Sequence, residues 1–413
     1  MRRALLLIPS TSYRARDYLD AARRLDIEIV VGSDRHQALH AFSGGRSLAL
    51  EFTPIGEGVA RILEYACRFP LSAIIGTDDE TAVLAAAASR VLRLPHNDPE
   101  SVANSRDKHR FRQVMARAGV RSPWFKRISL EEDLEATARS ISYPCVLKPL
   151  NLSASRAVIR ADDVAGFVAA SRRIRRILGN TSGPGHSTPG NSILVEAFIP
   201  GREVALEGLL ERGRLRMLAL FDKPDPLDGP YFEETIYVTP SRLPQDRQRE
   251  ITAEVDRAAS ALGLREGPIH AELRVNEGGV WLVEIAARTI GGLCSRMLRF
   301  TQGVTLEELV LRHALAWPTD GLTWHGDAAG VMMIPIPRAG RLRGITGLDA
   351  ARSISAIDDV IISVAIDDCL VPLPEGDRYL GFIFATADAP VDVEKALRCA
   401  HQQLAFDIEQ AAA

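Results

Sequence analysis

The stretch I-H-A-E-L-R-V-N-E-G-G-V-W-L-V-E-I-A-A-R-T-I-G-G, residues 269–292, carries the pattern that decides the fold we expect. Two runs within it, residues 269–275 and 280–285, have the alternation typical of short antiparallel strands. The four residues between them, Asn276 to Gly279, end in two glycines, which supply the positive φ that a tight turn needs. The sequence therefore predicts a β-hairpin at this position.

Two glutamates of this hairpin are candidate ligands for a metal ion. Alternation places Glu272 on the face of His270, and Glu284 on the face of Leu282. Carboxylates from paired strands can meet at one hard cation, because Mg²⁺ is usually bound by one or two carboxylates together with phosphate oxygens. The alternative is a surface hairpin with solvated charges. The apolar residues around Glu284 favour a buried strand instead, where a carboxylate needs a partner.

The composition limits the class of protein. A chain of 413 residues with 46% apolar content can form two or three domains with ordinary cores. Its formal charge of −3 gives no general attraction to nucleic acid or to an anionic membrane surface. No apolar run approaches the roughly 20 residues of a membrane span. Five scattered cysteines without a C-x-x-C pair suit a reducing cytoplasm and argue against structural zinc. We therefore expect a cytoplasmic protein that binds neither nucleic acid nor membranes.

Residues 1–95 alternate between strand and helix patterns, which predicts a parallel sheet with helices on both faces. No G-x-G-x-x-G motif follows the first strand, so a dinucleotide site is not favoured. Loops at the carboxyl ends of the strands would face a cleft: Pro9–Thr11, Gly32–Asp34 and Gly76–Asp79. Asp78 and Asp79 could line that cleft or cap the helix that begins at Glu80, and capping is the favoured interpretation.

Only five of the 50 basic residues are lysine. An ammonium is a compact point charge that fits beside a phosphate, so lysines in so arginine-rich a chain are candidate phosphate contacts. Lys148 lies in the apolar strand pattern Tyr143–Pro149, where an unpaired charge would be costly, and Lys108 lies at the start of a predicted helix. Surface positions are favoured for Lys126 and Lys395.

Four segments predict loops or linkers. Residues 95–107, rich in Pro, Asn, Asp and Ser, form a connector. Residues 151–157, N-L-S-A-S-R-A, form a small-residue loop that could hold phosphates, although it has no glycine. Residues 179–191 predict a flexible excursion. Residues 318–327 form a linker to a last segment whose strand and helix patterns predict a small α+β lobe.

In this order the features resemble the ATP-grasp superfamily, in particular the carboxylate–amine ligases that include the L-amino acid (dipeptide) ligases. The resemblance covers nearly the whole chain. It rests on these segments: D-K-H-R-F at 107–111, Y-P-C-V-L-K-P at 143–149, V-E-A-F-I-P-G-R-E at 195–203, F-E-E-T-I-Y-V-T-P at 232–240, H-A-E-L at 270–273 and V-E-I-A-A-R-T-I-G-G at 283–292.

The resemblance implies a multidomain α/β and α+β fold. Residues 1–95 would form a Rossmann-like N-terminal domain. Residues 96–317 would form the ATP-grasp core, with lobes at 96–200 and 201–317. Residues 318–413 would form the small α+β C-terminal lobe that closes such ligases.

The same resemblance implies a site for ATP and Mg²⁺ or Mn²⁺. Lys108, Lys148 and Ser155 would contact the phosphates. Glu196 and the backbone of Phe198 and Ile199 would face the adenine, and Glu203 the ribose hydroxyls. Glu272 and Glu284 would bind the metal.

The resemblance also implies which residues would contact the substrates. Arg288 would hold the carboxylate of the acid and then the tetrahedral oxyanion, as the catalytic residue. Glu234 and Tyr237 would contact an amino acid substrate. Gly291 and Gly292 leave space for a bulky acyl group. Lys223 could close over an acyl phosphate, although a surface position is almost as well supported.

Four positions depart from the family pattern. Ala286 stands where the family has an asparagine ligand, so one metal could be held more loosely. Ala154 and Ala157 stand where the phosphate loop usually has glycine, so the loop could be stiffer. Tyr237 falls where many dipeptide ligases have histidine, which leaves the amino acid substrate open.

The implied reaction joins a carboxylic acid to an amine, with an amino acid expected as a substrate. The carboxylate would attack the γ-phosphate of ATP to give an acyl phosphate and ADP, and the amine would then displace phosphate to form an amide. Two alternatives stay open: an ATP-grasp carboxylase or purine-synthetase-like enzyme that uses bicarbonate, and a nucleotide-binding module with a degenerate site. A homodimer is compatible with the sequence.

Overall fold

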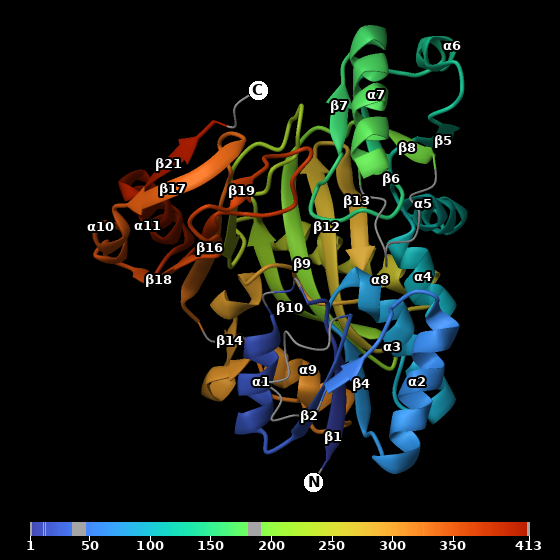
Figure 1. Ribbon diagram of the computed structural model, residues 1–413, viewed down its shortest axis with the longest axis vertical. Helices are drawn as coiled ribbons and strands as arrows, with labels where there is room; N and C mark the ends of the chain where they lie inside the picture. The colour runs from blue at the N-terminus through green and yellow to red at the C-terminus, as the bar shows by residue number, and fades with distance from the viewer. Residues whose placement is uncertain are drawn as a thin grey trace.

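The computed structural model describes residues 2–10, 12, 14–34, 47–180, 191–324 and 326–410. Most of the predicted excursion at 179–191, and Thr11 of the first strand-end loop, lie outside these ranges. Figure 1 shows three groups of elements around a central sheet: the N-terminal domain, a small sheet with helix α7, and the C-terminal elements.

The N-terminal domain is a parallel sheet with helices on both faces, which confirms the prediction. Its strand order is β3-β2-β1-β4. The strands are β1 (Arg3–Leu7), β2 (Glu28–Ser33), β3 (Ser47–Ala49) and β4 (Ala73–Gly76). The helices α2 (Ile55–Arg68) and α3 (Asp79–Leu92) pack on one face. The other face packs against α1 (Ala15–Arg24) and against α9 (Leu306–Ala314), which comes from much later in the chain (Figure 1).

The predicted connector at 95–107 contains a helix, α4 (Pro99–Arg106), that composition did not predict. The side chain of Asp98 accepts a hydrogen bond from the backbone nitrogen of Glu100 at 2.8 Å, and Pro99 occupies the first turn, where its missing N–H costs nothing. The same residues that indicated a loop therefore form a helix start. Helix α5 (Lys108–Arg117) follows, with Asp107 as its N-cap.

A four-stranded antiparallel sheet lies beyond α5, in the order β5-β8-β6-β7. Its strands are β5 (Phe125–Ser129), β6 (Cys145–Pro149), β7 (Ile159–Ala161) and β8 (Ser192–Ala197). Helices α6 (Leu134–Arg139) and α7 (Val164–Asn180) cover it. This sheet holds Lys148 at the end of β6 and Glu196 at the end of β8.

The centre of the molecule is an eight-stranded antiparallel sheet, in the order β13-β12-β9-β10-β11-β16-β20-β18. The strands are β9 (Arg202–Glu211), β10 (Arg214–Asp222), β11 (Ile236–Thr239), β12 (Gly267–Asn276), β13 (Gly279–Ala286), β16 (Ala328–Ile334), β18 (Ile357–Ile362) and β20 (Gly381–Ala387). Helix α8 (Gln245–Leu262) covers β12 and β13, and α11 (Pro390–Gln403) covers β16 and β20. The sheet runs without a break past residue 317, and the proposed domain limits stay a prediction.

The remaining elements are short. A three-stranded sheet, β19-β17-β21, closes the C-terminal end. Its strands are β17 (Gly340–Thr346), β19 (Cys369–Leu370) and β21 (Ala405–Glu409), and α10 (Leu348–Arg352) lies beside it. The segment after β13 forms η1 (Cys294–Met297), β14 (Arg299–Phe300), η2 (Thr301–Gly303) and β15 (Val304–Thr305). Among the helices in the described ranges, none has both the length and the apolar character that a membrane crossing requires.

The predicted hairpin is confirmed as β12 and β13, but one detail of its register was wrong. Glu272 pairs with Glu284 and Leu273 pairs with Leu282, so Val283 is an extra residue, a β-bulge. The bulge moves Glu284 to the opposite face from Leu282. Leu282 packs into the apolar core against α8, whereas Glu284 and Glu272 share the other face. A strict period of two cannot represent such an insertion.

Candidate active site

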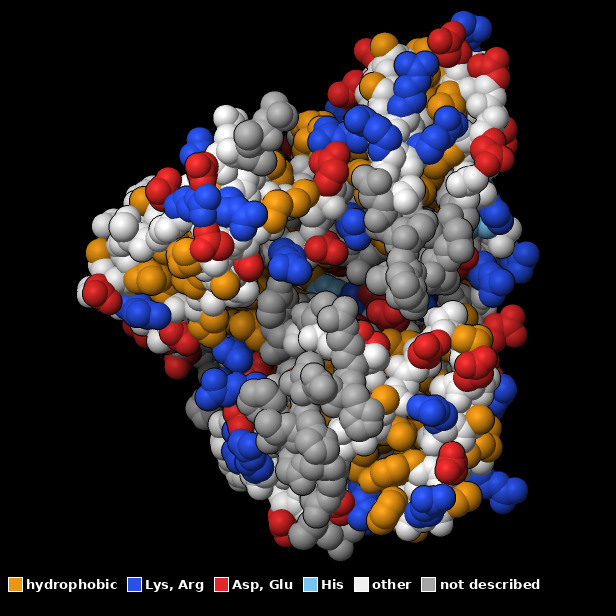
Figure 2. Space-filling model, in the orientation of Figure 1, with side chains coloured by type: hydrophobic (Ala, Val, Ile, Leu, Met, Phe, Trp, Pro, Cys, Tyr) orange, Lys and Arg blue, Asp and Glu red, His pale blue; other side chains and the backbone are white. Residues whose placement is uncertain are grey.

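A cleft of about 700 Å³ lies between the N-terminal domain, the four-stranded sheet and the central sheet. Figure 2 shows Lys, Arg, Asp and Glu side chains gathered around the hollow at the centre of this face. Every predicted site residue except Lys223 lines the cleft. Residues that are up to 184 positions apart, such as Lys108 and Gly292, therefore meet in one place.

One group of charges surrounds the carboxylate of Glu196, which is buried. Arg112 Nε donates to it at 2.6 Å, and Lys148 Nζ lies 2.5 Å away. Burial opposes ionisation of Glu196, but the two cations hold its pKa below the usual value. Arg112 also donates to the carbonyls of Leu282 and Val283, so it ties α5 to the bulge.

The groups predicted to contact adenine make contacts with other residues of the protein in this structure. The Glu196 carboxylate is held by two cations. The backbone N–H of Phe198 donates to the carbonyl of Pro144 at 3.0 Å, and the carbonyl of Ile199 accepts from Arg274 at 2.9 Å. All three residues still line the cleft, and a role toward adenine stays a prediction.

The small-residue loop before β7 has a glycine-like backbone. Ala154, Ser155 and Ala157 have φ angles of 55°, 54° and 58°, a region that side chains other than glycine rarely adopt. The loop reaches the cleft, where Lys108 Nζ donates to the carbonyl of Leu152 at 2.7 Å. Lys108 Nζ also lies 3.7 Å from Glu284, so the loop, α5 and β13 meet at this lysine.

A second group of charges surrounds the ammonium of Lys223, at the end of β10. It lies 2.8 Å from Glu203 and 3.3 Å from Glu272, and it donates to Glu234. The surface position considered for Lys223 is wrong, because its side chain is only 3% exposed. Burial raises the pKa of Glu234 to about 7, and the Glu272 carboxylate adds to this against the effect of Lys223.

The carboxylates of the second group are themselves positioned by neighbours. Arg274 Nε donates to Glu203 at 3.0 Å. His270 Nδ1 lies 3.0 Å from Glu207, and its Nε2 lies 3.7 Å from Glu272. Burial alone would lower the pKa of His270, but its bonds to these glutamates raise it to about 9. His270 therefore lies between Glu207 and Glu272 and adds positive charge beside the Glu272 carboxylate.

Arg288 meets an aspartate from the N-terminal domain. Its Nε and Nη2 donate to the two carboxylate oxygens of Asp79 at 3.0 and 2.8 Å. The expectation that Asp79 caps a helix is wrong, because Asp78 is the N-cap and its backbone N–H donates to Thr81 Oγ1 at 3.2 Å. Beside this pair the buried Arg14 donates to the carbonyl of Thr77 at 2.8 Å and to the hydroxyl of Thr289.

Two glycines shape the cleft beyond Arg288. A Cβ added at Gly291 would meet no atom within 4 Å, so the space in front of it is open. Gly292 has a φ of +60°, and a Cβ there would lie 3.0 Å from the ring of Phe382. Tyr237, whose ring faces the ring of Phe221 and the Lys223 ammonium, lines the same part of the cleft.

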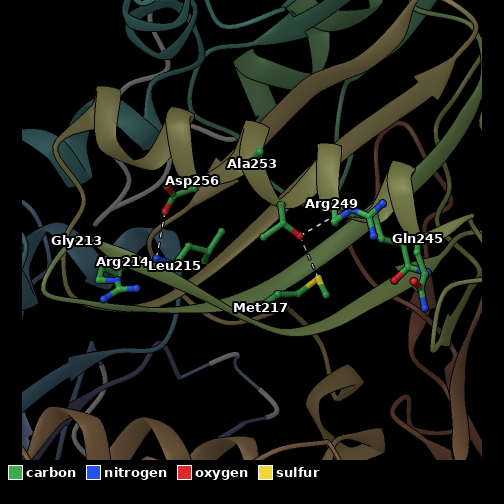
Figure 3. Close-up of a pocket in the computed structure, with 10 residues that line it drawn as sticks. Gly213, Arg214, Leu215, Met217, Gln245, Arg249, Ala253 and Asp256 are labelled. Carbon is green, nitrogen blue, oxygen red and sulfur yellow. Dashed lines mark hydrogen bonds between the residues drawn. The ribbon is translucent and has the colours of Figure 1, made fainter.

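A second hollow, of about 690 Å³, lies between β10 and α8 (Figure 3). Asp256 there accepts from the backbone of Leu215 at 3.1 Å, and Thr252 donates to the carbonyl of Gln248 at 2.9 Å. None of the predicted site residues lines this hollow. The chemistry expected from the sequence therefore belongs to the cleft.

Among the charged residues of the cleft, sequence reasoning missed Arg14, Arg112 and Arg274, and it favoured a helix cap for Asp79. Signals existed for two of them. Arg112 lies four residues after Lys108 on one helix face, and Arg274 follows His270 and Glu272 on one strand face. Asp79 and Arg14 come from the other domain, and no local pattern connects them to Arg288.

Comparison with known families agrees with this fold. Residues 141–297 match the ATP-grasp domain, and residues 332–409 match the L-amino acid ligase C-terminal domain 2. The chain therefore contains an ATP-grasp domain. A later segment is similar to the C-terminal domain of the L-amino acid ligases.

Individual relatives support the same placement. Alanine--anticapsin ligase of Bacillus subtilis is 28% identical over 273 residues, which are 62% of this chain and 57% of that protein. A protein of Sinorhizobium fredii, y4rH, is 25% identical over 99% of this chain and 84% of its own length. The match to alanine--anticapsin ligase therefore spans little more than half of the length of that protein. The crystal structure of L-amino acid ligase from Bacillus licheniformis has a TM-score of 0.82 and 24% identity, covering 100% of this chain and 99% of that one, which shows the fold.

Proposed function

We propose that this protein is an ATP-dependent carboxylate–amine ligase that forms an amide or peptide bond through an acyl phosphate and releases ADP and phosphate. One observation carries the proposal. Two lysines, two glutamates and an arginine from separate segments line a single cleft: Lys108, Lys148, Glu272, Glu284 and Arg288. The ATP-grasp fold supplies the nucleotide site, and the ligase named among the relatives supports amide formation.

The residues of the cleft suit phosphoryl transfer, which asks a protein mainly for positioning and for positive charge. Lys108 and Lys148 would hold phosphate oxygens. The loop that contains Ser155 lines the cleft, and the hydroxyl of Ser155 would contact a phosphate oxygen. Arg288 would hold the carboxylate of the acid and then the oxyanion that forms when the amine attacks.

The carboxylates of the cleft fit a hard divalent cation. Ligand oxygens of Glu203, Glu234 and Glu272 lie within 4.8 Å of one another, and Glu284 is the register partner of Glu272. Such all-oxygen donors are typical of Mg²⁺ or Mn²⁺ sites. When bound, the cation would supply charge neutralisation to the phosphates, with Glu272 and Glu284 as its ligands. Ala286 offers no ligand, so water would complete the shell.

The substrate end of the cleft favours an amino acid. Glu234 offers a carboxyl group to an ammonium, and Tyr237 offers a hydroxyl in the same region. The open space at Gly291 accommodates a side chain on the acyl component. Location in the cytoplasm and a homodimer stay predictions.

A phosphate-release screen tests the proposal. The protein would be incubated with Mg-ATP and all pairs of amino acids, and products identified by mass spectrometry. We expect acid- and amine-dependent phosphate release with one amide product, and loss of turnover in Arg288→Ala and Glu284→Ala, since removing such a group typically costs about 10²–10³ in rate.

Three results would contradict it. Release of ADP with bicarbonate and no amine would support the carboxylase alternative. A thermal shift with Mg-ATP but no ADP from any mixture would support a binding module. Turnover by Arg288→Ala at the wild-type rate would remove Arg288 from the mechanism.

A further inference from the structure

We infer that Asp79 is a positioning residue: it fixes the guanidinium of Arg288 so that two free N–H groups form a fork for the substrate carboxylate. This inference rests on the proposed function for the identity of the ligand. It assigns a role in the reaction to the N-terminal domain, in which helix capping was the favoured interpretation of Asp79.

The hydrogen bonds of Arg288 show which donors remain. A guanidinium has five N–H groups. Nε–H and one N–H of Nη2 go to Asp79, and one N–H of Nη1 goes to the carbonyl of Thr289 at 3.0 Å. Within the described ranges, one N–H of each Nη has no partner in the protein, and Nη1 and Nη2 together form the end of the planar group. Parallel donors of this kind match the two oxygens of a carboxylate.

Asp79 binds the edge of the guanidinium that Nε and Nη2 form. The contact is bidentate, and the side chains of Arg288 and Asp79 are only 15% and 22% exposed, so solvent screens it weakly. The Arg288 charge holds the pKa of Asp79 below its usual value, although burial acts in the opposite direction. Asp79 therefore stays ionised at neutral pH and keeps one orientation of the guanidinium.

The backbone near the pair is also fixed across the two domains. Arg14, which is 2% exposed, links the carbonyl of Thr77 to the hydroxyl of Thr289. The residues just before Asp79 and just after Arg288 are thus tied to the same side chain. The loop between β4 and α3 therefore supports Arg288 through two contacts, the ion pair with Asp79 and the bridge made by Arg14.

A purely structural contact of the same kind provides the control. Arg296 Nε donates to both oxygens of Asp17 at 3.1 and 2.9 Å, with side chains 26% and 16% exposed. This pair also joins the N-terminal domain to the segment after β13. Neither residue lines the cleft. Loss of the Asp17 contact would weaken domain docking without changing the fork.

The first experiment compares Asp79→Asn with Asp17→Asn in the full chain, using the amino acid pair that gives the fastest phosphate release. We expect Asp79→Asn to lower kcat/KM for the acid by about 100-fold, through a higher KM for the acid and a lower kcat, because misplacement by about 1 Å of the group that holds the reacting carboxylate costs that much. The KM for ATP should not change. Asp17→Asn should keep wild-type kinetics, and Asp79→Glu should recover part of the rate. Equal losses in the Asp79→Asn and Asp17→Asn variants would overturn the inference.

A double variant tests whether Asp79 acts through Arg288. If it does, Asp79→Asn adds no further loss in an Arg288→Lys background, since the fork is already gone. If the rate losses of Asp79→Asn and Arg288→Lys instead multiply in the double variant, Asp79 does not act through Arg288, and the inference is contradicted.

A crystal structure of Asp79→Asn with Mg-ADP gives a readout that needs no turnover. We expect the guanidinium of Arg288 to leave its position beside the carbonyl of Thr289. An unmoved guanidinium would refute the positioning role, whether or not a ligase activity is found. Absence of turnover in the wild-type chain would contradict only the proposed function.

Discussion

Two groups of buried charge in the cleft have opposite compositions. Around Glu196, one carboxylate meets two cations, Arg112 and Lys148. Around Lys223, one ammonium meets three carboxylates, Glu203, Glu234 and Glu272. The first group has more positive charge than it needs, and the second has more carboxylate than Lys223 alone can neutralise.

The pKa values follow this difference. The pKa of Glu196 falls below its usual value in spite of burial, since two cations act on it. Burial and Glu272 raise the pKa of Glu234 to about 7 in spite of Lys223. The excess cations suit phosphate oxygens, and the excess carboxylates suit a metal ion or a substrate ammonium. The comparison therefore divides the cleft into a phosphate end and a cation-binding end.

The largest effect should come from Lys223→Met, which removes the ammonium from the carboxylate group. Breaking a buried ion pair typically costs about 3–5 kcal/mol. We expect a loss of this size in the free energy of unfolding, measured by urea denaturation. Added Mg²⁺ should restore more stability in the variant than in the wild type, because the ion replaces the lost charge. Equal gains in stability with Mg²⁺ in both proteins would contradict a cation-binding role for the carboxylates around Lys223.

Lys148→Ala tests the other group. Glu196 keeps Arg112 as a partner, so the fold should survive, while the phosphates lose a contact. We expect turnover to fall by about 10²–10³ and ADP to bind more weakly in calorimetry. Lys126, an exposed lysine on strand β5 of the same sheet, gives the matched control, and Lys126→Ala should bind ADP like the wild type. Identical ADP affinity in both variants would contradict the assignment.

The third prediction concerns the pH dependence of the free energy of unfolding, to which Glu234 should contribute. Burial raises the pKa of Glu234 in the folded protein to about 7, from the usual 4.5 of a glutamate side chain. The protonated carboxyl therefore stabilises the fold below pH 4.5, and this contribution is lost as the pH rises through 7. The loss amounts to about 3 kcal/mol at most. Glu234→Gln should flatten the pH profile of the nucleotide-free protein between these limits. A variant with the wild-type slope would exclude Glu234 as its source.

The smallest effect should come from an ion pair outside both groups. Arg173 donates to both oxygens of Glu375 at 2.7 and 2.8 Å, joining α7 to the C-terminal elements. The side chains of Arg173 and Glu375 are 33% and 40% exposed. Exposed pairs contribute about 0.2–1 kcal/mol, so Glu375→Gln should change the free energy of unfolding by no more than this. A loss as large as that of Lys223→Met would show that burial does not govern these contacts.

The sequence predicted the elements whose signal is local. Alternation and the Gly278-Gly279 turn located the hairpin, and the scarcity of lysine drew attention to Lys108 and Lys148. The residues that the sequence did not predict depend on geometry between distant segments. The bulge at Val283 changes the face of Glu284, and no pattern of period two contains it.

The ion pairs show the same limit. Glu196 was predicted to face a nucleotide base, yet two cations from α5 and β6 hold its carboxylate. Asp79 was interpreted as a cap, because an aspartate before a helix usually is one. Its partner Arg288 is 209 residues away, and only the packing of the N-terminal domain against the central sheet joins them.

A crystal structure of the protein with Mg²⁺ and ADP tests the central claim most directly. The account predicts the ADP phosphates beside Lys108 and Lys148, and the ion between those phosphates and the carboxylates of Glu272 and Glu284. ADP bound elsewhere, for example in the hollow between β10 and α8, or carboxylates of the hairpin with no ion near them, would contradict it.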